Sequence, residues 1–124
     1  MTKDVVKGYA EAVWKGDLSD ARKYLADAGF SFDGTLAKYE GKGSADKVIE
    51  NVKGFRQMVK GVTFLEEVYS GNTASLLYDV ATASPAGTIR MAEFYEVSNG
   101  KIVKMKLVFD ASELHLYNLS LIHI

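Results

Sequence analysis

The chain of 124 residues contains no cysteine, a single proline and only two histidines, His115 and His123. The absence of cysteine excludes disulfide bonds and thiol chemistry. Two histidines without any cysteine disfavour a histidine-built metal site, so we expect no metal. The scarcity of proline, together with a hydrophobic content of 48%, is typical of a folded domain and not of a disordered chain.

The chain also has almost no excess of charge of either sign. Its formal net charge is −1, acidic and basic residues are interspersed, and no basic stripe is present, so nucleic-acid binding has no electrostatic support. No apolar run is long enough to span a membrane, and the first four residues lead directly into an amphipathic pattern instead of a signal-peptide core. We therefore expect a cytoplasmic protein without nucleic-acid or membrane partners, in keeping with the lack of cysteine.

Three segments have the apolar spacing of amphipathic helices, and the other apolar segments alternate as strands do. Asn99-Gly100 is the strongest short hairpin signal in the chain. The expected helices are 6–16, 17–29 and 44–59, with Asp17 and Ser44 as N-caps, and the expected strands are 30–32 continued at 36–39, 62–69, 73–83, 88–97 and 101–109.

This order of elements predicts an α+β fold, in which about three helices cover a cone-shaped, curved antiparallel sheet. Such a cone has a hollow interior that suits a small apolar molecule.

The Asn99-Gly100 hairpin also predicts the two faces of the sheet, because a tight turn fixes strand pairing and side chains alternate between faces. With a two-residue loop and uninterrupted pairing, Arg90 and Phe109 share one face, and Asp79 lies on it as well. We take this face as the concave, helix-covered side, which makes Asp79 and Arg90 diagonal neighbours inside the cone. The opposite face receives Leu76, Tyr78, Met91, Glu93, Tyr95, Lys104 and Lys106.

Several short patterns occur together along the chain: Tyr9 followed by Gly16-Asp17, the aromatic strand 30–33, and the hairpin region 93–110. In this combination the chain resembles the nuclear transport factor 2-like superfamily, and within it the SnoaL-like and ketosteroid-isomerase-like branch, over roughly residues 5 to 114. The resemblance implies one SnoaL-like domain, which we assign to residues 1–118. As an indication of function it is weak, because this fold hosts isomerases, cyclases, hydrolases, dehydratases and non-catalytic binders.

The resemblance also implies roles for single residues. Ketosteroid isomerases use a tyrosine and a protonated aspartate as an oxyanion hole, and a second aspartate as a proton shuttle. Tyr9 falls where that tyrosine lies and Asp33 where the shuttling base lies, but Ala92 stands at the position of the oxyanion aspartate. Because a missing donor costs about a hundredfold in rate, ketosteroid isomerase activity itself is not expected. Limonene-epoxide hydrolases share the fold and use a carboxylate on the last strand. Leu107 stands at that position in this chain, so their pattern is broken as well.

Each candidate also has a purely structural interpretation. Asp33 either faces the pocket as a base, or Asp33-Gly34 simply turns the chain. Tyr9 either donates its hydroxyl into the cavity or is an ordinary core aromatic. Trp14 and Phe109 suit the wall of a lipophilic pocket, and large aromatics near the ends of helices and strands also simply fill a core.

Two pairs of charges are expected on the sheet. Asp79 and Arg90 either orient a polar group of the ligand or form a structural ion pair, which would lie in solvent if the face assignment is inverted. Glu93 and Lys106 are predicted to form a cross-strand ion pair on the outer face. That outer face is where the superfamily commonly dimerises, so the resemblance implies a homodimer.

The last six residues, 119–124, match the translation of a transposase adapter used in DNA sequencing libraries. We interpret them as a non-native tail, which implies a gene assembled from metagenomic reads and a natural chain that is truncated near Asn118. The alternative is a genuine apolar C-terminal strand or helix. Asp110 and Glu113 have the spacing of a capping box and are predicted to start a terminal turn.

Together these features predict a protein that holds a small hydrophobic molecule without a cofactor, because a carboxylate and a phenol can enolise a carbonyl compound unaided. If it is an enzyme, Asp33 shuttles a proton or activates water and Tyr9 polarises a carbonyl. The reaction would be that of an isomerase, cyclase or hydrolase acting on a carbonyl or epoxide compound. The alternative is a non-catalytic ligand-binding or protein-interaction domain of the same fold.

Overall fold

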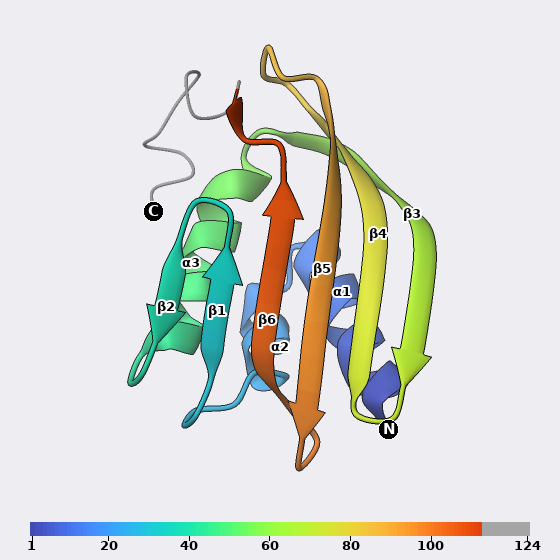
Figure 1. Cartoon of the computed structure of the whole chain (residues 1–124). Coiled ribbons are helices and arrows are strands. Elements are labelled where there is room, and N and C mark those ends of the chain that lie inside the picture. Colours follow the sequence, from blue (N-terminus) through green and yellow to red (C-terminus); the bar gives the residue numbers. More distant parts are fainter. Residues whose placement is uncertain (113–124) are drawn as a thin grey trace.

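The computed structural model describes residues 1–112, which form helices on one side of a curved sheet (Figure 1). This arrangement confirms the predicted α+β fold. The predicted tail 119–124, Glu113 of the capping box and both histidines lie outside the described residues. In chain order the elements are α1 (Thr2–Lys15), α2 (Leu18–Lys23), β1 (Ser31–Gly34), β2 (Lys38–Glu40), α3 (Ser44–Arg56), β3 (Val59–Ser70), β4 (Thr73–Thr82), β5 (Thr88–Ser98) and β6 (Lys101–Phe109).

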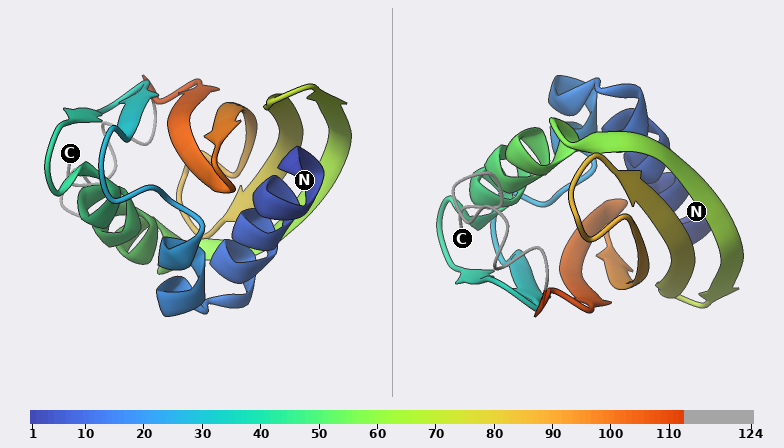
Figure 2. Two further views of the ribbon diagram at one scale, coloured as in Figure 1. Left: turned by 90° about the horizontal axis from the view of Figure 1, so that it is seen from below. Right: turned by 90° about the horizontal axis from the view of Figure 1, so that it is seen from above.

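The six strands form one sheet in the order β2-β1-β6-β5-β4-β3. Neighbouring strands are antiparallel except β1 and β6, which are parallel. The sheet is thus mainly antiparallel, as expected. The parallel pairing of β1 with β6 is possible because a long stretch of chain separates these two strands. Figure 2 shows the sheet curving around the helices, all of which lie on its concave side.

The helix ends follow local signals in part. The α1 helix stops at Gly16, which adopts φ 89°, and the Asp17 side chain caps α2 by accepting a hydrogen bond from the Asp20 backbone N–H. The α2 helix ends at Lys23 and not at 29, because the chain then turns to pair with β6 at Ile102.

At the start of α3 the predicted cap is wrong by one residue. Gly43 occupies the N-cap position, with φ 81°. The buried Ser44 hydroxyl lies within hydrogen-bond distance of two carbonyl oxygens, that of Gly41 at 2.7 Å and that of Phe30 at 3.0 Å, and so ties the helix to the start of β1. The helix ends at Arg56, and residue 59 already belongs to β3.

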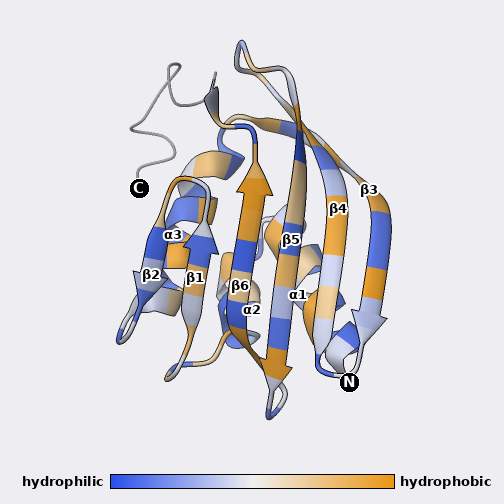
Figure 3. Ribbon diagram, in the orientation of Figure 1, coloured by the Kyte–Doolittle hydropathy of each residue, from blue (hydrophilic) through white to orange (hydrophobic). Residues whose placement is uncertain are grey.

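The hydrophobic core lies between the helices and the concave face. Apolar and polar residues alternate along the strands, as a sheet with one buried face requires (Figure 3). The largest fully buried side chains are Phe30, Leu25, Ile102, Met105, Val6 and Val80.

A β-bulge at Val103 decides which side chains point into this core. The pairing of β5 with β6 passes from Val97–Ile102 to Glu96–Lys104, so Val103 has no partner opposite it. Because one extra residue reverses the alternation, the predicted inward face is right for the end of β6 and wrong for β4 and β5. The buried side chains are Ala74, Leu76, Tyr78, Val80 and Thr82 of β4 and Ile89, Met91, Glu93, Tyr95 and Val97 of β5.

Candidate functional site

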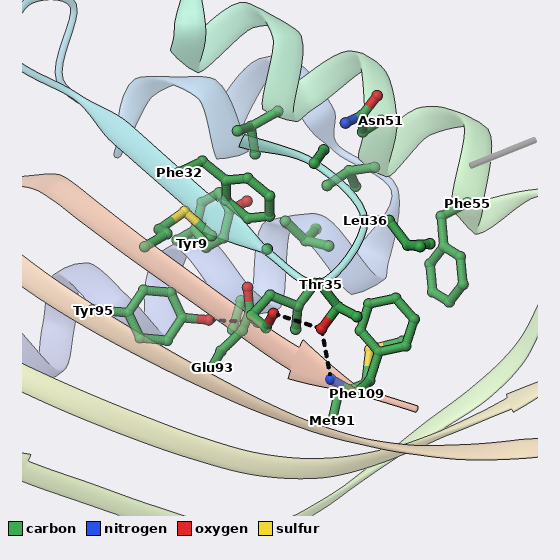
Figure 4. Close-up of a pocket in the computed structure, with 18 of the residues that line it drawn as sticks. Tyr9, Phe32, Thr35, Leu36, Asn51, Phe55, Met91, Glu93, Tyr95 and Phe109 are labelled. Carbon is green, nitrogen blue, oxygen red and sulfur yellow. Dashed lines mark hydrogen bonds between the residues drawn. The ribbon is translucent and has the colours of Figure 1, made fainter. Parts of the chain in front are cut away.

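A cavity of about 100 Å³, measured as the space open to the centres of water molecules, lies between the helices and the concave face (Figure 4). Side chains from α1, α3, β1, β4, β5, β6 and the β1–β2 turn line it, and most of them are apolar or aromatic. Thr35 is exposed and Leu36, Phe55 and Phe109 are half-buried, so we place the mouth of the cavity among them.

One carboxylate stands in this apolar interior. Glu93, on β5, is 9% exposed and accepts two hydrogen bonds at Oε1, from the Tyr78 hydroxyl at 2.6 Å and the Tyr95 hydroxyl at 2.7 Å. Among residues 1–112 the only completely buried side-chain nitrogen or oxygen without a partner belongs to Arg56. Oε2 of Glu93 takes part in none of the hydrogen bonds among residues 1–112, and Glu93 lines the cavity.

The environment of Glu93 raises its pKa above the ordinary value of 4.5. Burial is the main cause, because it penalises the charged form, and the Tyr78 and Tyr95 hydroxyls oppose it by donating to that form. Burial and the Glu93 charge also raise the pKa values of both tyrosines far above the ordinary value, so they remain neutral donors.

The Tyr9 hydroxyl is the second polar group at the cavity. Tyr9, on α1, is 3% exposed, and its ring packs edge-on against the Tyr95 ring, with centroids 6.4 Å apart. Within residues 1–112 its hydroxyl has no hydrogen-bond partner, and Tyr9 lines the cavity. Burial, and to a smaller extent the Glu93 charge, raises the pKa of Tyr9, so the group stays a donor. Among residues 1–112 the cavity thus presents one acceptor, Glu93 Oε2, and one donor, the Tyr9 hydroxyl, without a partner.

Comparisons with known proteins agree with this architecture. No family model and no curated protein matches the chain. A nuclear transport factor 2-like protein of unknown function from Cytophaga hutchinsonii is 21% identical, with a TM-score of 0.75 over 93% of this chain and 95% of that one. A steroid delta-isomerase from Pseudomonas aeruginosa is 15% identical, with a TM-score of 0.74 over 92% and 83%. A candidate SnoaL-like polyketide cyclase from Shewanella putrefaciens is 12% identical, with a TM-score of 0.71 over 92% and 82%.

The chain has the nuclear transport factor 2-like fold. At these identities the likeness shows the fold and leaves the activity open.

Three of the predicted site residues lie at the cavity of this nuclear transport factor 2-like fold: Tyr9, Trp14 and Phe109. Trp14 packs edge-on against Tyr78, with ring centroids 5.9 Å apart, and Phe109 is at the mouth. Their roles toward a ligand stay predictions.

Asp33 does not reach the cavity, so the expectation that it faces the pocket is wrong. Successive residues of β1 face opposite sides of the sheet. Phe32 and Gly34 line the cavity, and the Asp33 side chain between them points away from it. The Asp33 side chain is 51% exposed, with Oδ1 4.0 Å from Lys38 Nζ.

The predicted ligand clamp of Asp79 and Arg90 lies on the outer face and not in the cavity. Arg90 Nε donates to Asp79 Oδ1 at 2.8 Å and Nη2 to Oδ2 at 3.0 Å. The Arg90 hydrogen bonds lower the pKa of Asp79. The inverted-face alternative, an ion pair at the surface, is therefore the correct one.

The predicted Glu93–Lys106 ion pair is also wrong, because the bulge places Leu107 opposite Glu93 and Phe94 opposite Lys106. Glu93 is the site residue that the sequence-based prediction missed. Its alternate neighbours Met91 and Tyr95 are apolar, so a face chosen by hydrophobicity instead of hairpin counting would have found it.

The described residues hold no group of three or more histidine, cysteine, aspartate or glutamate side chains that could bind a metal ion. None of the helices among them is long and apolar enough to cross a membrane.

Proposed function

We propose that the protein binds a small, neutral, hydrophobic carbonyl compound and moves a proton on it. The observation that supports this most is a carboxylate with one free oxygen, beside a neutral phenol, in an apolar cavity. Neighbours of the same fold include a steroid delta-isomerase and a candidate SnoaL-like polyketide cyclase.

The cavity favours a neutral ligand for an electrostatic reason. The Glu93 carboxylate already carries a charge that is costly in an apolar interior, and an anionic ligand would add a second one. The apolar walls favour a hydrocarbon body, and the limited volume favours a small ring.

In the proposed reaction Oε2 of Glu93 removes a proton from the carbon next to the carbonyl group. The C–H electron pair forms the carbon–carbon double bond of an enolate, and the carbonyl π electrons move to oxygen, where the Tyr9 hydroxyl donates a hydrogen bond. Glu93 then returns the proton to the same or to a conjugated carbon. Its raised pKa brings it closer to that of the carbon acid, which improves a general base. Tyr78 and Tyr95 hold the carboxylate in place.

Proton exchange tests this proposal without knowledge of the natural substrate. We expect the protein to accelerate exchange of α-protons for deuterium in at least one member of a panel of cyclic ketones and enones, measured by proton NMR in deuterium oxide. The rate should saturate with ketone, because the reaction takes place in a cavity. Binding without exchange, seen by Trp14 fluorescence, would support the alternative of a non-catalytic ligand-binding domain. The absence of both would overturn the proposal.

We further propose a homodimer formed through the outer face of the sheet. Tyr78 and Tyr95, which were expected on this face, point inward instead. The face exposes Phe94 (44%) and Val108 (58%) on neighbouring strands. Large exposed apolar side chains on one face are typical of protein interfaces.

We expect the unmodified protein to sediment as a dimer in analytical ultracentrifugation and the Phe94→Lys variant as a monomer, since a buried unpaired lysine is unfavourable. Glu50→Lys, on the exposed surface of α3, is the matched control and should remain dimeric. A monomeric unmodified protein would contradict this proposal.

A further inference from the structure

A second hollow lies where the C-terminal ends of α1 and α3 meet the beginning of β3. It is an open groove of about 300 Å³ in the same measure, lined by Trp14, Arg56, Phe64 and residues 59–62. Figure 2 shows α3 leading directly into β3. Trp14 is the wall that the groove shares with the cavity.

Arg56 brings to this groove a positive charge that no other side chain of residues 1–112 neutralises. Among residues 1–112 no carboxylate lies within ion-pair distance of it, and its buried Nε has no hydrogen-bond partner. Leaving a buried donor unpaired is unfavourable, and more so for a charged group. The unneutralised charge of Arg56 indicates a site for an acceptor from outside. Nε itself is completely buried, so such an acceptor reaches Arg56 through the part of the half-buried side chain that lines the groove.

Structural contacts within the protein use only part of the hydrogen-bonding capacity of the Arg56 guanidinium. The guanidinium lies against Gly16, and Nη2 donates to the Trp14 carbonyl at 3.4 Å. A cation at the C-terminal end of α1 is favourable, because the helix dipole is negative there. That contact uses one nitrogen at a long distance and leaves Nε without a partner.

The rest of the groove complements an anion with a flat apolar body. Lys60, exposed on β3, supplies a second positive charge, and no acidic side chain lines the groove. Trp14 and Phe64 supply aromatic surface, and Phe64 is 40% exposed. Guanidinium groups bind carboxylates with paired, parallel hydrogen bonds, so a carboxylate is the anion that this geometry suits.

We propose that the groove is a second binding site, for a small aromatic carboxylate. The carboxylate pairs with Arg56 and Lys60, and the ring packs against Trp14 and Phe64. This site goes beyond the proposed function, since the cavity accepts a neutral ligand and the groove an anion.

Benzoate, with benzyl alcohol as its neutral counterpart, tests the proposal. We expect benzoate to bind at least tenfold more tightly than benzyl alcohol in titrations followed by ¹H–¹⁵N NMR. The shifts should centre on the Trp14 indole, the chain's only tryptophan, and on the amides of Gly61 and Val62. Shifts centred on the Met91 amide would instead place benzoate in the cavity and overturn the proposal, while leaving the proposed function intact.

Charge variants show whether the two cations carry the affinity. Arg56→Gln should weaken benzoate at least tenfold, and Lys60→Gln should weaken it while leaving the Arg56 contact with α1 in place. Lys53→Gln, which removes an exposed charge from α3 outside the groove, is the matched control and should leave the affinity unchanged. If Arg56→Gln fails to fold, Lys60→Gln and a salt titration give the same test. Equal affinity in Lys60→Gln and the unmodified protein, with no effect of salt, would overturn the proposal.

Discussion

Replacing Glu93 with glutamine is expected to slow α-proton exchange by about two to four orders of magnitude, the usual contribution of a general base. Glutamine has nearly the same shape, and its carbonyl oxygen can still accept the Tyr78 and Tyr95 hydrogen bonds. It cannot take up a proton, so the variant separates proton transfer from binding. The loss should therefore appear in kcat, with KM changed little.

The pH profile identifies which form of Glu93 is active. A base must be ionised, so kcat/KM should rise with pH through the raised pKa of Glu93 and then level off. Tyr95→Phe removes a donor that stabilises the ionised form, so this limb should move to higher pH. A rate that falls as pH rises through the same region would mean that the neutral acid is active, and would contradict the proposed role.

A matched control lies three positions along the same strand. Glu96→Gln makes the same chemical change on the outer face, where Glu96 lies opposite Lys104 in the strand register, and should leave exchange unchanged. If Asp33→Asn abolished exchange while Glu93→Gln did not, the base would be Asp33, as first expected from the sequence.

Unfolding measurements check the environment of Glu93 without any substrate. Because its pKa is higher in the folded than in the unfolded chain, the folded state holds more protons between the two values. The contribution of Glu93 to stability is thus fully present below pH 4.5 and is lost as pH rises through the raised pKa. The Glu93→Gln variant should lack this decline, which urea unfolding at a series of pH values can measure.

The parts of the fold that were predictable depend on short-range signals. The α1 helix follows from the spacing of apolar residues along one stripe, and its end from Gly16, which adopts a left-handed conformation. The last hairpin follows from Asn99-Gly100, where both residues have positive φ, as a two-residue turn requires. Tyr9 was found at the cavity because it lies on that same helical stripe.

The inward faces of β4 and β5 could not be predicted, because they depend on one bulged residue in β6, Val103. Nothing in the local sequence around Val103 marks a bulge, since the segment 101–109 reads as a regular strand. The bulge nevertheless reverses the facing of β4 and β5 relative to the end of β6, from which the inward face was chosen. It moved Asp79 and Arg90 out of the expected site and Glu93 into it. Ala92, which the resemblance places where ketosteroid isomerases have the oxyanion aspartate, points outward. Its neighbour Glu93 points inward.

Two single-residue deletions in β6 should separate the effect of this bulge from that of strand length. Deleting Val103 removes only the unpaired residue and preserves the pairs Glu96–Lys104 and Tyr95–Met105. All inward side chains keep their facing, so we expect a folded protein with the cavity intact.

Deleting Lys106 shortens the same strand by one residue beyond the bulge, and no register then satisfies both of its ends. If the bulge stays, Leu107 and Phe109 turn to the outer face, and with them two walls of the cavity are lost. If the bulge closes instead, Lys104 must enter the core. Transferring two half-buried apolar side chains to water should cost about 2–4 kcal/mol. Urea unfolding of both deletions measures the difference, and equal destabilisation would show that the bulge itself, and not the facing of the side chains, holds this sheet together.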